Sequence, residues 1–499
     1  MRTFITGKKQ KNKKAGRQAA VCLFWLAAWQ AAALAVGKPL ILPGPWDTLT
    51  ALAALIAESE FYFNVLWTLL RCAMALVISF VLGCACAWGA YRAPAFRAVL
   101  TLPVGFFKAV PVMAIVIYVI LIAAADWVAV IVCFLMCFPI VYTNVLTGFD
   151  GISEEYLELA EIYDLSSAEK LRYIYWPGAA AQVEAAVRLI AGMSWKAVVA
   201  AEVLSIPKYS LGYEMLNAKY YLRTPDLFAY IAVIVILSLA AEKGVEVFLE
   251  RSGPKNYEGS HIAVRSRRTV CDARPREVKF MSVSKTFGEK TVLSDTWAVL
   301  RPGKTNILMG PSGKGKTTFA RLLTGLDDPD SGEICFYGPD GRPCERPEIA
   351  YLFQEDRLLP WLNVYDNMAL ALIRSGKPEG EDPVMEMAKA LELEDSLWKL
   401  PEELSGGMKH RAALGRTFLS LEAGAGLAVF DEPFRGLDSD LRKRIIDRLW
   451  KRCAAGRTVL LITHDEDNRL LGENMIELED NDQEAKDVLP SRMRGEPLS

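Results

Sequence analysis

The sequence predicts two parts: an α-helical transmembrane bundle of about six helices in the first half and an α/β domain with a phosphate-binding loop in the second. The first 250 of the 499 residues carry 38 charged side chains, whereas the remaining 249 carry 78. A half so poor in charge cannot solvate itself as an ordinary soluble domain, which excludes a wholly soluble enzyme. The formal net charge of −2 excludes a nucleic-acid binder driven by net charge.

The apolar stretches of the first half predict the membrane helices, because a spanning helix needs about 20 apolar residues. Seven of the first 17 residues are basic and precede the uncharged run 19–36. We expect this run to be a retained first helix with its basic end in the cytoplasm, rather than a cleaved signal peptide. Four or five spans in all remain an alternative to six. The further expected spans are residues 63–90, 100–124, 127–147, 187–205 and 227–248.

Four charged residues fall inside these spans, at Arg71, Lys108, Lys196 and Glu202. Charges within a membrane are costly, so each either lines a translocation path or pairs and snorkels within the bundle, and pairing is the favoured interpretation. Proline within the spans predicts broken or kinked helices. Six of the ten cysteines lie in apolar runs without CxxC spacing, which does not favour a metal or disulfide role.

A polar segment of about 35 residues separates the fourth and fifth spans and is predicted to be helical over 154–169. Tyr156, Leu159 and Tyr163 share one face of this helix, acidic residues follow Ser153 at its start, and Pro177 is the expected stop. Its polar face is mainly acidic, whereas membrane-surface helices usually carry Lys and Arg. The pattern therefore favours docking to a cytoplasmic partner.

This segment resembles the "EAA…G…LP" loop of binding-protein-dependent ABC importer permeases. The resemblance rests on Glu158-Leu159-Ala160, Asp164 and Tyr175-Trp176-Pro177, with Leu159 where the second Ala is usual and Asp164 where Gly is usual. In that family the loop fits a groove on the ATPase subunit, which implies a coupling role for Glu158, Ala160 and Asp164. Downstream residues resemble the nitrate/sulfonate/taurine/bicarbonate branch, namely Trp195-Lys196, Ala201-Glu202, Leu211-Gly212 and Tyr221 to Pro225.

Composition divides the rest of the chain. Residues 251–276 are rich in Gly, Ser, Pro and basic residues and predict a flexible linker after a permease domain at 1–250. This linker is expected to lie against anionic lipid headgroups, with a nucleic-acid patch as the alternative. Residues 277–480 form the second domain, and 481–499 a polar tail.

A glycine-rich loop follows the predicted strand 306–309 and precedes a helical pattern. Residues 310–318 read Gly-Pro-Ser-Gly-Lys-Gly-Lys-Thr-Thr, which is GxxxxGK[ST] in the strand-to-helix context of a P-loop. Backbone N–H groups at a helix N-terminus can bind a triphosphate, Lys316 reaches the β- and γ-phosphates, and Thr317 ligates Mg²⁺. The predicted ATP contacts in this loop are Gly310, Ser312, Gly313, Lys314, Gly315, Lys316, Thr317 and Thr318.

Two acids follow a second predicted strand at 427–430. Asp431 is expected to hold Mg²⁺ through water, and Glu432 is the candidate base that orients or activates the attacking water. Paired acids after a strand are weak evidence alone, but the P-loop lies about 115 residues upstream. Together the two motifs predict an ATP-hydrolysing site.

Further motifs resemble those of the ABC ATPases, in the order that this family has. Leu404-Ser405-Gly406-Gly407-Met408 is similar to "LSGGQ", with Met408 in place of Gln. In the family this motif binds the γ-phosphate of ATP held by the other subunit, which implies a homodimer. Residues 357–361 (Arg-Leu-Leu-Pro-Trp) again resemble the nitrate/sulfonate/taurine branch. The resemblance further implies Gln354 as the Q-loop residue that reports Mg²⁺ and water, His464 as the switch histidine, Phe287 as the aromatic that stacks on adenine, and Asp438 in the D-loop.

The resemblance as a whole implies a fused permease and ATPase of an ABC importer in the cytoplasmic membrane of a prokaryote. It implies ATP and Mg²⁺ as cofactors, a homodimer, a separate extracytoplasmic substrate-binding protein, and catalytic roles for Glu432, His464 and Gln354. An ABC exporter and a non-transporting mechanochemical ATPase remain alternatives, although the short membrane half and the docking loop favour an importer. The branch implies a small anion such as sulfonate, nitrate or taurine, or a vitamin precursor, as the substrate.

Overall fold

The fold is that of a computed structural model, which describes residues 2–252, 262, 277–311, 313–338, 340–373, 382–453, 456–464 and 471–478. The chain divides into two compact units. One comprises Met1–Gly151 and Gly178–Gly253, and the other comprises Ile152–Pro177 and Pro254–Ser499. Most of the expected linker, the whole expected tail and Ser312 lie outside the described residues.

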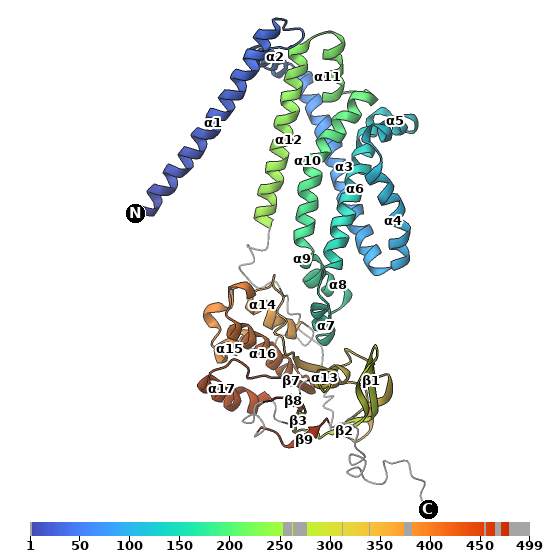
Figure 1. The fold of residues 1–499 in the computed structure, drawn as a ribbon, viewed down its shortest axis with the longest axis vertical. Coiled ribbons are helices and arrows are strands. Elements are labelled where there is room, and N and C mark those ends of the chain that lie inside the picture. The colour runs from blue at the N-terminus through green and yellow to red at the C-terminus, as the bar shows by residue number, and fades with distance from the viewer. Residues whose placement is uncertain are drawn as a thin grey trace, which may run out of the picture. The chain divides into compact units, whose positions relative to one another are not determined.

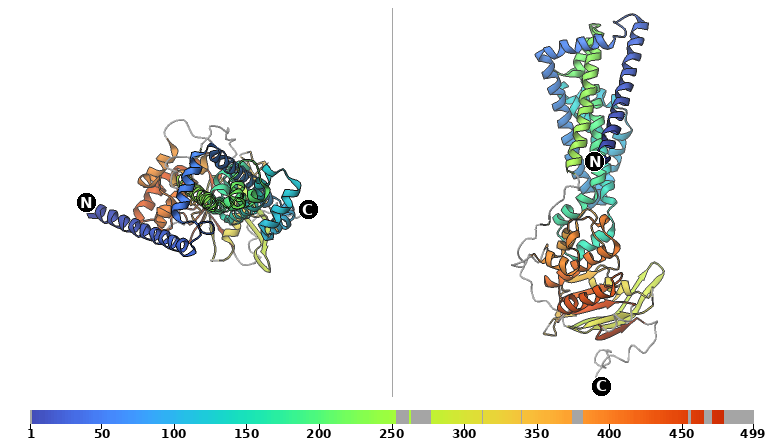
Figure 2. Two further views of the ribbon diagram at one scale, coloured as in Figure 1. Left: turned by 90° about the horizontal axis from the view of Figure 1, so that it is seen from above. Right: turned by 90° about the vertical axis from the view of Figure 1, so that its left-hand side faces the viewer.

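In its described part, the first unit has helices as its regular secondary structure, joined by loops (Figure 1). Figures 1 and 2 show α3, α6 and α10 side by side. Gly83 permits this packing, because a Cβ there would lie 2.6 Å from Val141 Cγ1 on the neighbouring helix. The helices of the unit are α1 Arg2–Val36, α2 Pro45–Ala57, α3 Ser59–Arg92, α4 Pro94–Ala109, α5 Val112–Ile122, α6 Ala125–Asp150, α10 Ala180–Ser205, α11 Leu211–Tyr220 and α12 Thr224–Ser252.

Among the described helices, α3, α6 and α12 are long and apolar enough to cross a membrane, and α4 with α5 gives a fourth candidate if the bent pair is one span. The expected span 100–124 is therefore not one straight helix. It breaks before Pro111, where α4 and α5 meet at 108°, because proline lacks a backbone N–H and disfavours a helical residue before it. The first expected span corresponds to the shorter apolar helix Ala20–Val36, and the span 187–205 lies within the more highly charged α10.

Arg71 and Glu202 pair inside the first unit, which confirms the pairing interpretation for these two residues. Their side chains are almost fully buried, and Arg71 Nη1 lies 2.9 Å from Glu202 Oε1. Arg71 also donates to the carbonyl oxygens of Lys208 and Tyr209, each at 3.0 Å. The Thr68 hydroxyl and the backbone N–H of Gly212 donate to the same Glu202 carboxylate. By contrast, Lys108 and Lys196 are exposed within the unit.

The second unit contains two sheets in its described part. The antiparallel sheet has the order β2-β1-β4-β5, and the parallel sheet the order β6-β7-β8-β3-β9. The strands β6, β7, β8 and β3 of the parallel sheet are short and almost wholly buried, as expected for strands covered on both faces, whereas the edge strand β9 is partly exposed. The strands are β1 Glu277–Phe287, β2 Lys290–Leu300, β3 Thr305–Met309, β4 Ser331–Tyr337, β5 Pro343–Cys344, β6 Ile349–Leu352, β7 Leu427–Asp431, β8 Thr458–Ile462 and β9 Asn474–Glu477.

Helices surround the parallel sheet and form the expected helical subdomain around α14, α15 and α16 (Figure 1). The α-helices are α13 Lys316–Thr324, α14 Val364–Ala369, α15 Pro383–Ala390, α16 Gly406–Glu422, α17 Ser439–Ile445 and α18 Lys451–Cys453. Short 3₁₀ turns lie at Leu370–Leu372, Glu394–Ser396 and Pro401–Glu403, and a π-helical turn at Ile446–Trp450.

The polar segment 152–177 belongs to this second unit, although it connects α6 and α10 of the first. The predicted helix over 154–169 is too long, because α7 spans only Glu154–Ile162. Asp164 has a φ of +46°, a left-handed conformation that ends the helix at the position where the importer permeases usually have glycine. Pro177 is not the stop either, because it lies inside the short helix α9. The segment continues through α8 Ser167–Lys170, a π-helical turn at Leu171–Tyr175 and α9 Trp176–Gly178.

Candidate functional site

The glycine-rich loop connects the inner strand β3 to helix α13, as the sequence predicts. Gly310, Gly313 and Gly315 have φ values of +148°, +82° and +86°, which side-chain-bearing residues rarely adopt. A Cβ on Gly315 would also lie 2.9 Å from Val292 Cγ1. The loop therefore needs glycine both for its backbone conformation and for its close packing.

Lys316 begins α13 and is 8% exposed. Its ammonium group donates to the carbonyl oxygens of Gly310 and Pro311 at 2.6 and 3.0 Å, which fixes the side chain across the loop. Burial lowers the pKa of Lys316, and the nearby carboxylates of Asp431 and Glu432 oppose this shift. A partly desolvated cation at the start of a helix is suited to binding a phosphate group.

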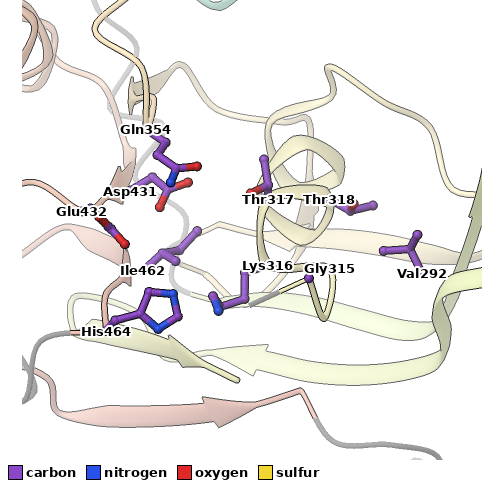
Figure 3. A pocket seen from close by; sticks show the side chains of 11 residues that line it. Val292, Gly315, Lys316, Thr317, Thr318, Gln354, Asp431, Glu432, Ile462 and His464 are labelled. Carbon is purple, nitrogen blue, oxygen red and sulfur yellow. The ribbon is translucent and has the colours of Figure 1, made fainter. Parts of the chain in front are cut away.

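A pocket of about 270 Å³ opens at this loop (Figure 3). Parallel strands bring residues that are distant in sequence to the same sheet edge, since Gln354, Asp431 and His464 all lie at or after the carboxyl ends of neighbouring strands. Figure 3 shows Gln354, Asp431 and Glu432 grouped on one side of this pocket. The predicted site residues that line it are Gly313, Gly315, Lys316, Thr317, Thr318, Gln354, Asp431, Glu432 and His464.

Two carboxylates lie at the carboxyl end of β7, where Asp431 is the last residue of the strand and Glu432 follows it. Asp431 is 5% exposed, and burial together with the adjacent Glu432 raises the pKa of Asp431 to about 6. Glu432 has a φ of +49°, and its backbone N–H donates to the carbonyl oxygen of Ile462 at 2.9 Å. This bond to the neighbouring strand holds Glu432 in a sparsely populated conformation of the kind that clusters at functional sites.

The residues of the pocket fit a magnesium ion by their chemistry. Thr317, Gln354 and Asp431 offer a hydroxyl, an amide and a carboxylate oxygen to the same pocket, and Mg²⁺ prefers oxygen ligands. The raised pKa of Asp431 reflects a buried negative charge that a cation would compensate.

The other predicted nucleotide residues do not line this pocket. Ser405 is the N-cap of α16, where its hydroxyl accepts from the N–H of Met408, and Gly406 and Gly407 line a second pocket of about 340 Å³. Asp438 caps α17 and accepts from the N–H of Leu441 at 2.9 Å. Phe287, at the end of β1, is 49% exposed. Gly310 lines a neighbouring pocket together with His464, and Lys314 is not among the residues that line the P-loop pocket.

Glu158 of the predicted coupling loop is held between two arginines of the same unit. Its carboxylate lies 2.9 Å from Arg321 Nη1 and 2.5 Å from Arg357 Nη1. Arg321 lies on α13, which begins at Lys316, and Arg357 follows Gln354 by three residues. The clamp therefore connects α7 to the helix and to the loop that supply pocket residues.

Aromatic and apolar contacts surround this clamp. Trp361 Nε1 donates to the carbonyl oxygen of Tyr173 at 2.8 Å, and the ring of Trp361 lies edge-on to Tyr156, with 5.5 Å between their centroids. Leu159 and Ala160 are each 1% exposed. The leucine at the usual alanine position is therefore accommodated in the packed contact of α7.

Sequence reasoning missed the partners in this contact. Arg321 belongs to no motif, and Arg357 and Trp361 belong only to a resemblance that assigns them no role. The signal for Arg357 and Trp361 was their place three and seven residues after the predicted Q-loop residue Gln354.

Comparisons with known proteins agree with the two parts of the chain. Residues 79–244 match the family described as "Binding-protein-dependent transport system inner membrane component", and residues 293–435 match the family "ABC transporter". The fold and the site thus define a permease domain joined to an ABC ATPase domain. The chain combines, in one polypeptide, a domain that matches the binding-protein-dependent permease family and a domain that matches the ABC transporter family.

Curated relatives carry names from import systems. The Fe(3+) ions import ATP-binding protein FbpC of Agrobacterium fabrum is 36% identical over 233 residues, which cover 45% of this chain and 65% of the relative. The aliphatic sulfonates import ATP-binding protein SsuB 2 of Pseudomonas fluorescens is 37% identical over 186 residues, which cover 37% and 66%. The chain thus spans slightly less than two thirds of the length of these relatives.

A solved structure is also similar. It is described as a dimeric post-hydrolysis state of an ATP-binding cassette bound to ADP and Pi. It is 28% identical, covers 40% of this chain and 94% of its own, and has a TM-score of 0.35.

Proposed function

We propose that two copies of this chain form an ATP-driven importer of a small solute in the cytoplasmic membrane of a prokaryote, with the ATPase domains in the cytoplasm. The two family matches in one polypeptide support a transport function. The observation that carries the coupling is the clamp of Glu158 between Arg321 and Arg357. It connects the segment between two permease helices to the nucleotide pocket.

The pocket residues have distinct roles in the proposed hydrolysis. Backbone N–H groups of the loop and the ammonium group of Lys316 bind the triphosphate. Glu432 orients the attacking water and accepts its proton, and His464 contacts the γ-phosphate. Bound Mg²⁺, held by Thr317, Gln354 and Asp431, would neutralise charge on the phosphates.

A second copy completes the proposed site. Ser405 caps a 17-residue helix that begins at Gly406 and Gly407, and the N-terminus of a helix favours anions. These three residues do not line the P-loop pocket of their own chain. In a symmetric dimer they would face the triphosphate held by the partner. ATP then shifts the population toward the closed dimer, because it binds that state better than the open one.

Closure and reopening act on the permease helices through α7. Gln354 lines the pocket, and Arg357 in the same loop holds Glu158, so a displacement of this loop displaces α7. The other arginine of the clamp, Arg321, lies on the helix that binds phosphate at its start. Helix α13 and the loop after Gln354, which both supply residues to the nucleotide pocket, thus contact the same carboxylate, that of Glu158.

The proposed solute is a small anion such as a sulfonate, nitrate or taurine, or a vitamin precursor, delivered by an extracytoplasmic binding protein. The resemblance to the nitrate/sulfonate/taurine branch and the aliphatic-sulfonate relative support an anion. The relative named for Fe(3+) import makes iron a competing cargo. Both relatives are named as ATP-binding proteins, so their names bear mainly on the ATPase half.

The experiment that tests the proposal is ATP hydrolysis by the purified full chain in lipid nanodiscs, with Glu432→Gln as the comparison. The wild type should hydrolyse ATP, and the variant should bind ATP without turning it over. Wild-type turnover in Glu432→Gln would refute the role of Glu432. Uptake into proteoliposomes, measured with candidate binding proteins, then identifies the solute. If the chain hydrolyses ATP but takes up no solute with any candidate binding protein, the result would favour a non-transporting ATPase.

A further inference from the structure

His410 joins three segments of the ATPase domain through its imidazole ring. It lies on α16, four residues after Gly406, and is 6% exposed. Its Nδ1 lies 2.9 Å from Asp356 Oδ1, and its Nε2 lies 2.9 Å from the carbonyl oxygen of Pro433. Each ring nitrogen thus lies within hydrogen-bond distance of an oxygen atom, one from the segment after Gln354 and one from the segment after Glu432.

The two partners of His410 stand next to residues of the nucleotide pocket. Asp356 follows Gln354 by two residues, and Pro433 directly follows Glu432. His410 itself does not line the pocket of Figure 3. It is therefore placed to fix the position of Gln354 and Glu432 without lining the P-loop pocket of its own chain.

Arg416 strengthens the same attachment from further along α16. This arginine is 1% exposed and donates to the carbonyl oxygens of Asp356 and Arg357, each at 3.0 Å. It holds only the backbone of the segment after Gln354. His410 contacts that segment and the one after Glu432 at the same time.

We propose that His410 is a positioning residue for ATP hydrolysis, which sets the distance between the water-orienting Glu432 and the Gln354 loop from helix α16. The inference rests on the proposed ATPase function and deepens it. Because α16 begins at the residues that would face the partner's triphosphate, His410 also connects that helix to the hydrolytic residues of its own chain. Asp356 is the charged group next to the ring, and the charged residues Glu355 and Arg435 line the same second pocket as His410.

The test is steady-state ATPase kinetics of the full chain in nanodiscs. His410→Ala should lower kcat by about tenfold to 100-fold, the loss expected when a catalytic group is misplaced. The KM for ATP should change by less than about twofold, because Lys316 and the loop keep their own contacts. His410→Gln retains a hydrogen-bond donor of similar reach and should recover a large part of kcat.

A double-mutant cycle separates this role from general destabilisation. Asp356→Ala breaks one of the two bonds and should lower kcat less than His410→Ala, and the double variant should be no slower than His410→Ala alone. Lys389→Ala, an exposed cation on α15, is the control and should match the wild type. Thermal unfolding of each variant identifies any that fail to fold, in which case Asp356→Ala and His410→Gln carry the test.

The outcomes distinguish the two proposals. A wild-type chain without ATP hydrolysis overturns the proposed function and this inference with it. Wild-type hydrolysis with kcat unchanged in folded His410 and Asp356 variants overturns this inference alone. Additive losses, or a rise in KM at constant kcat, would equally contradict a positioning role.

Discussion

Reversing the charge of Glu158 should release α7 from the rest of the ATPase unit. Glu158 makes two charge-assisted hydrogen bonds, to Arg321 and Arg357, and the three side chains are 13–24% exposed. Bonds of this type contribute about 1.5–3 kcal/mol each when well buried. After discounting for partial exposure, Glu158→Arg should weaken docking of α7 by about 2–4 kcal/mol.

Both arginines keep other contacts, so the variant should stay folded. Arg321 Nε still lies 2.6 Å from Asp327 Oδ2, and Arg357 still lies over the Phe353 ring at 3.9 Å. The expected effect is therefore local to α7. In transport assays, the same change should uncouple ATP hydrolysis from uptake.

Hydrogen–deuterium exchange of the chain in nanodiscs measures this release directly. A loss of about 2–4 kcal/mol corresponds to a roughly 30- to 1,000-fold faster exchange of the protected amides of α7. Glu161→Arg is the matched control, because Glu161 lies on the same helix with its side chain 57% exposed and only a 3.9 Å ion pair to Lys170. Equal exchange in the two variants would refute the clamp.

Three further predictions concern the pocket and the bundle. Lys316→Ala should weaken ATP binding itself, measured by equilibrium titration, and unchanged affinity would remove Lys316 from the phosphate site. Because the pKa of Asp431 is raised to about 6, its carboxylate becomes protonated as the pH falls through that value; the Mg²⁺ concentration for half-maximal ATPase activity should therefore rise between about pH 7.5 and about pH 5.5. A flat Mg²⁺ requirement would count against Asp431 as a ligand. Arg71→Leu leaves the buried Glu202 without its cation and should destabilise the bundle by about 3–5 kcal/mol in unfolding assays, and Glu202→Gln in the same chain should restore part of this loss.

The local signals in the sequence predicted the strand–loop–helix unit well. The apolar runs before Gly310, Gln354, Asp431 and His464 are strands, and they end at the same edge of one parallel sheet. Short apolar runs followed by glycines or acids carry this information locally. The functional roles of these residues stay predictions until they are tested.

The sequence could not predict the contacts that depend on tertiary structure. Glu158 and Arg357 are 199 residues apart, and His410 and Asp356 are 54 apart, so no local pattern joins them. The end of α7 was also predicted wrongly, because helical periodicity continues past Ile162 while Asp164 adopts a left-handed conformation. Pairing within the bundle was the favoured interpretation for Arg71 and Glu202, but the sequence did not show that they pair with each other, since burial cost alone does not select a partner.

The most direct test of the account is whether one chain's P-loop and another chain's Ser405 form a single ATP site. In the Glu432→Gln background, chains with Lys316→Ala and chains with Ser405→Arg should each fail to retain ATP as homodimers. Co-assembled in one nanodisc, the two variants leave one intact site per mixed dimer, so ATP retention should reappear. Retention by Ser405→Arg alone, or none in the mixed dimer, would contradict the composite site.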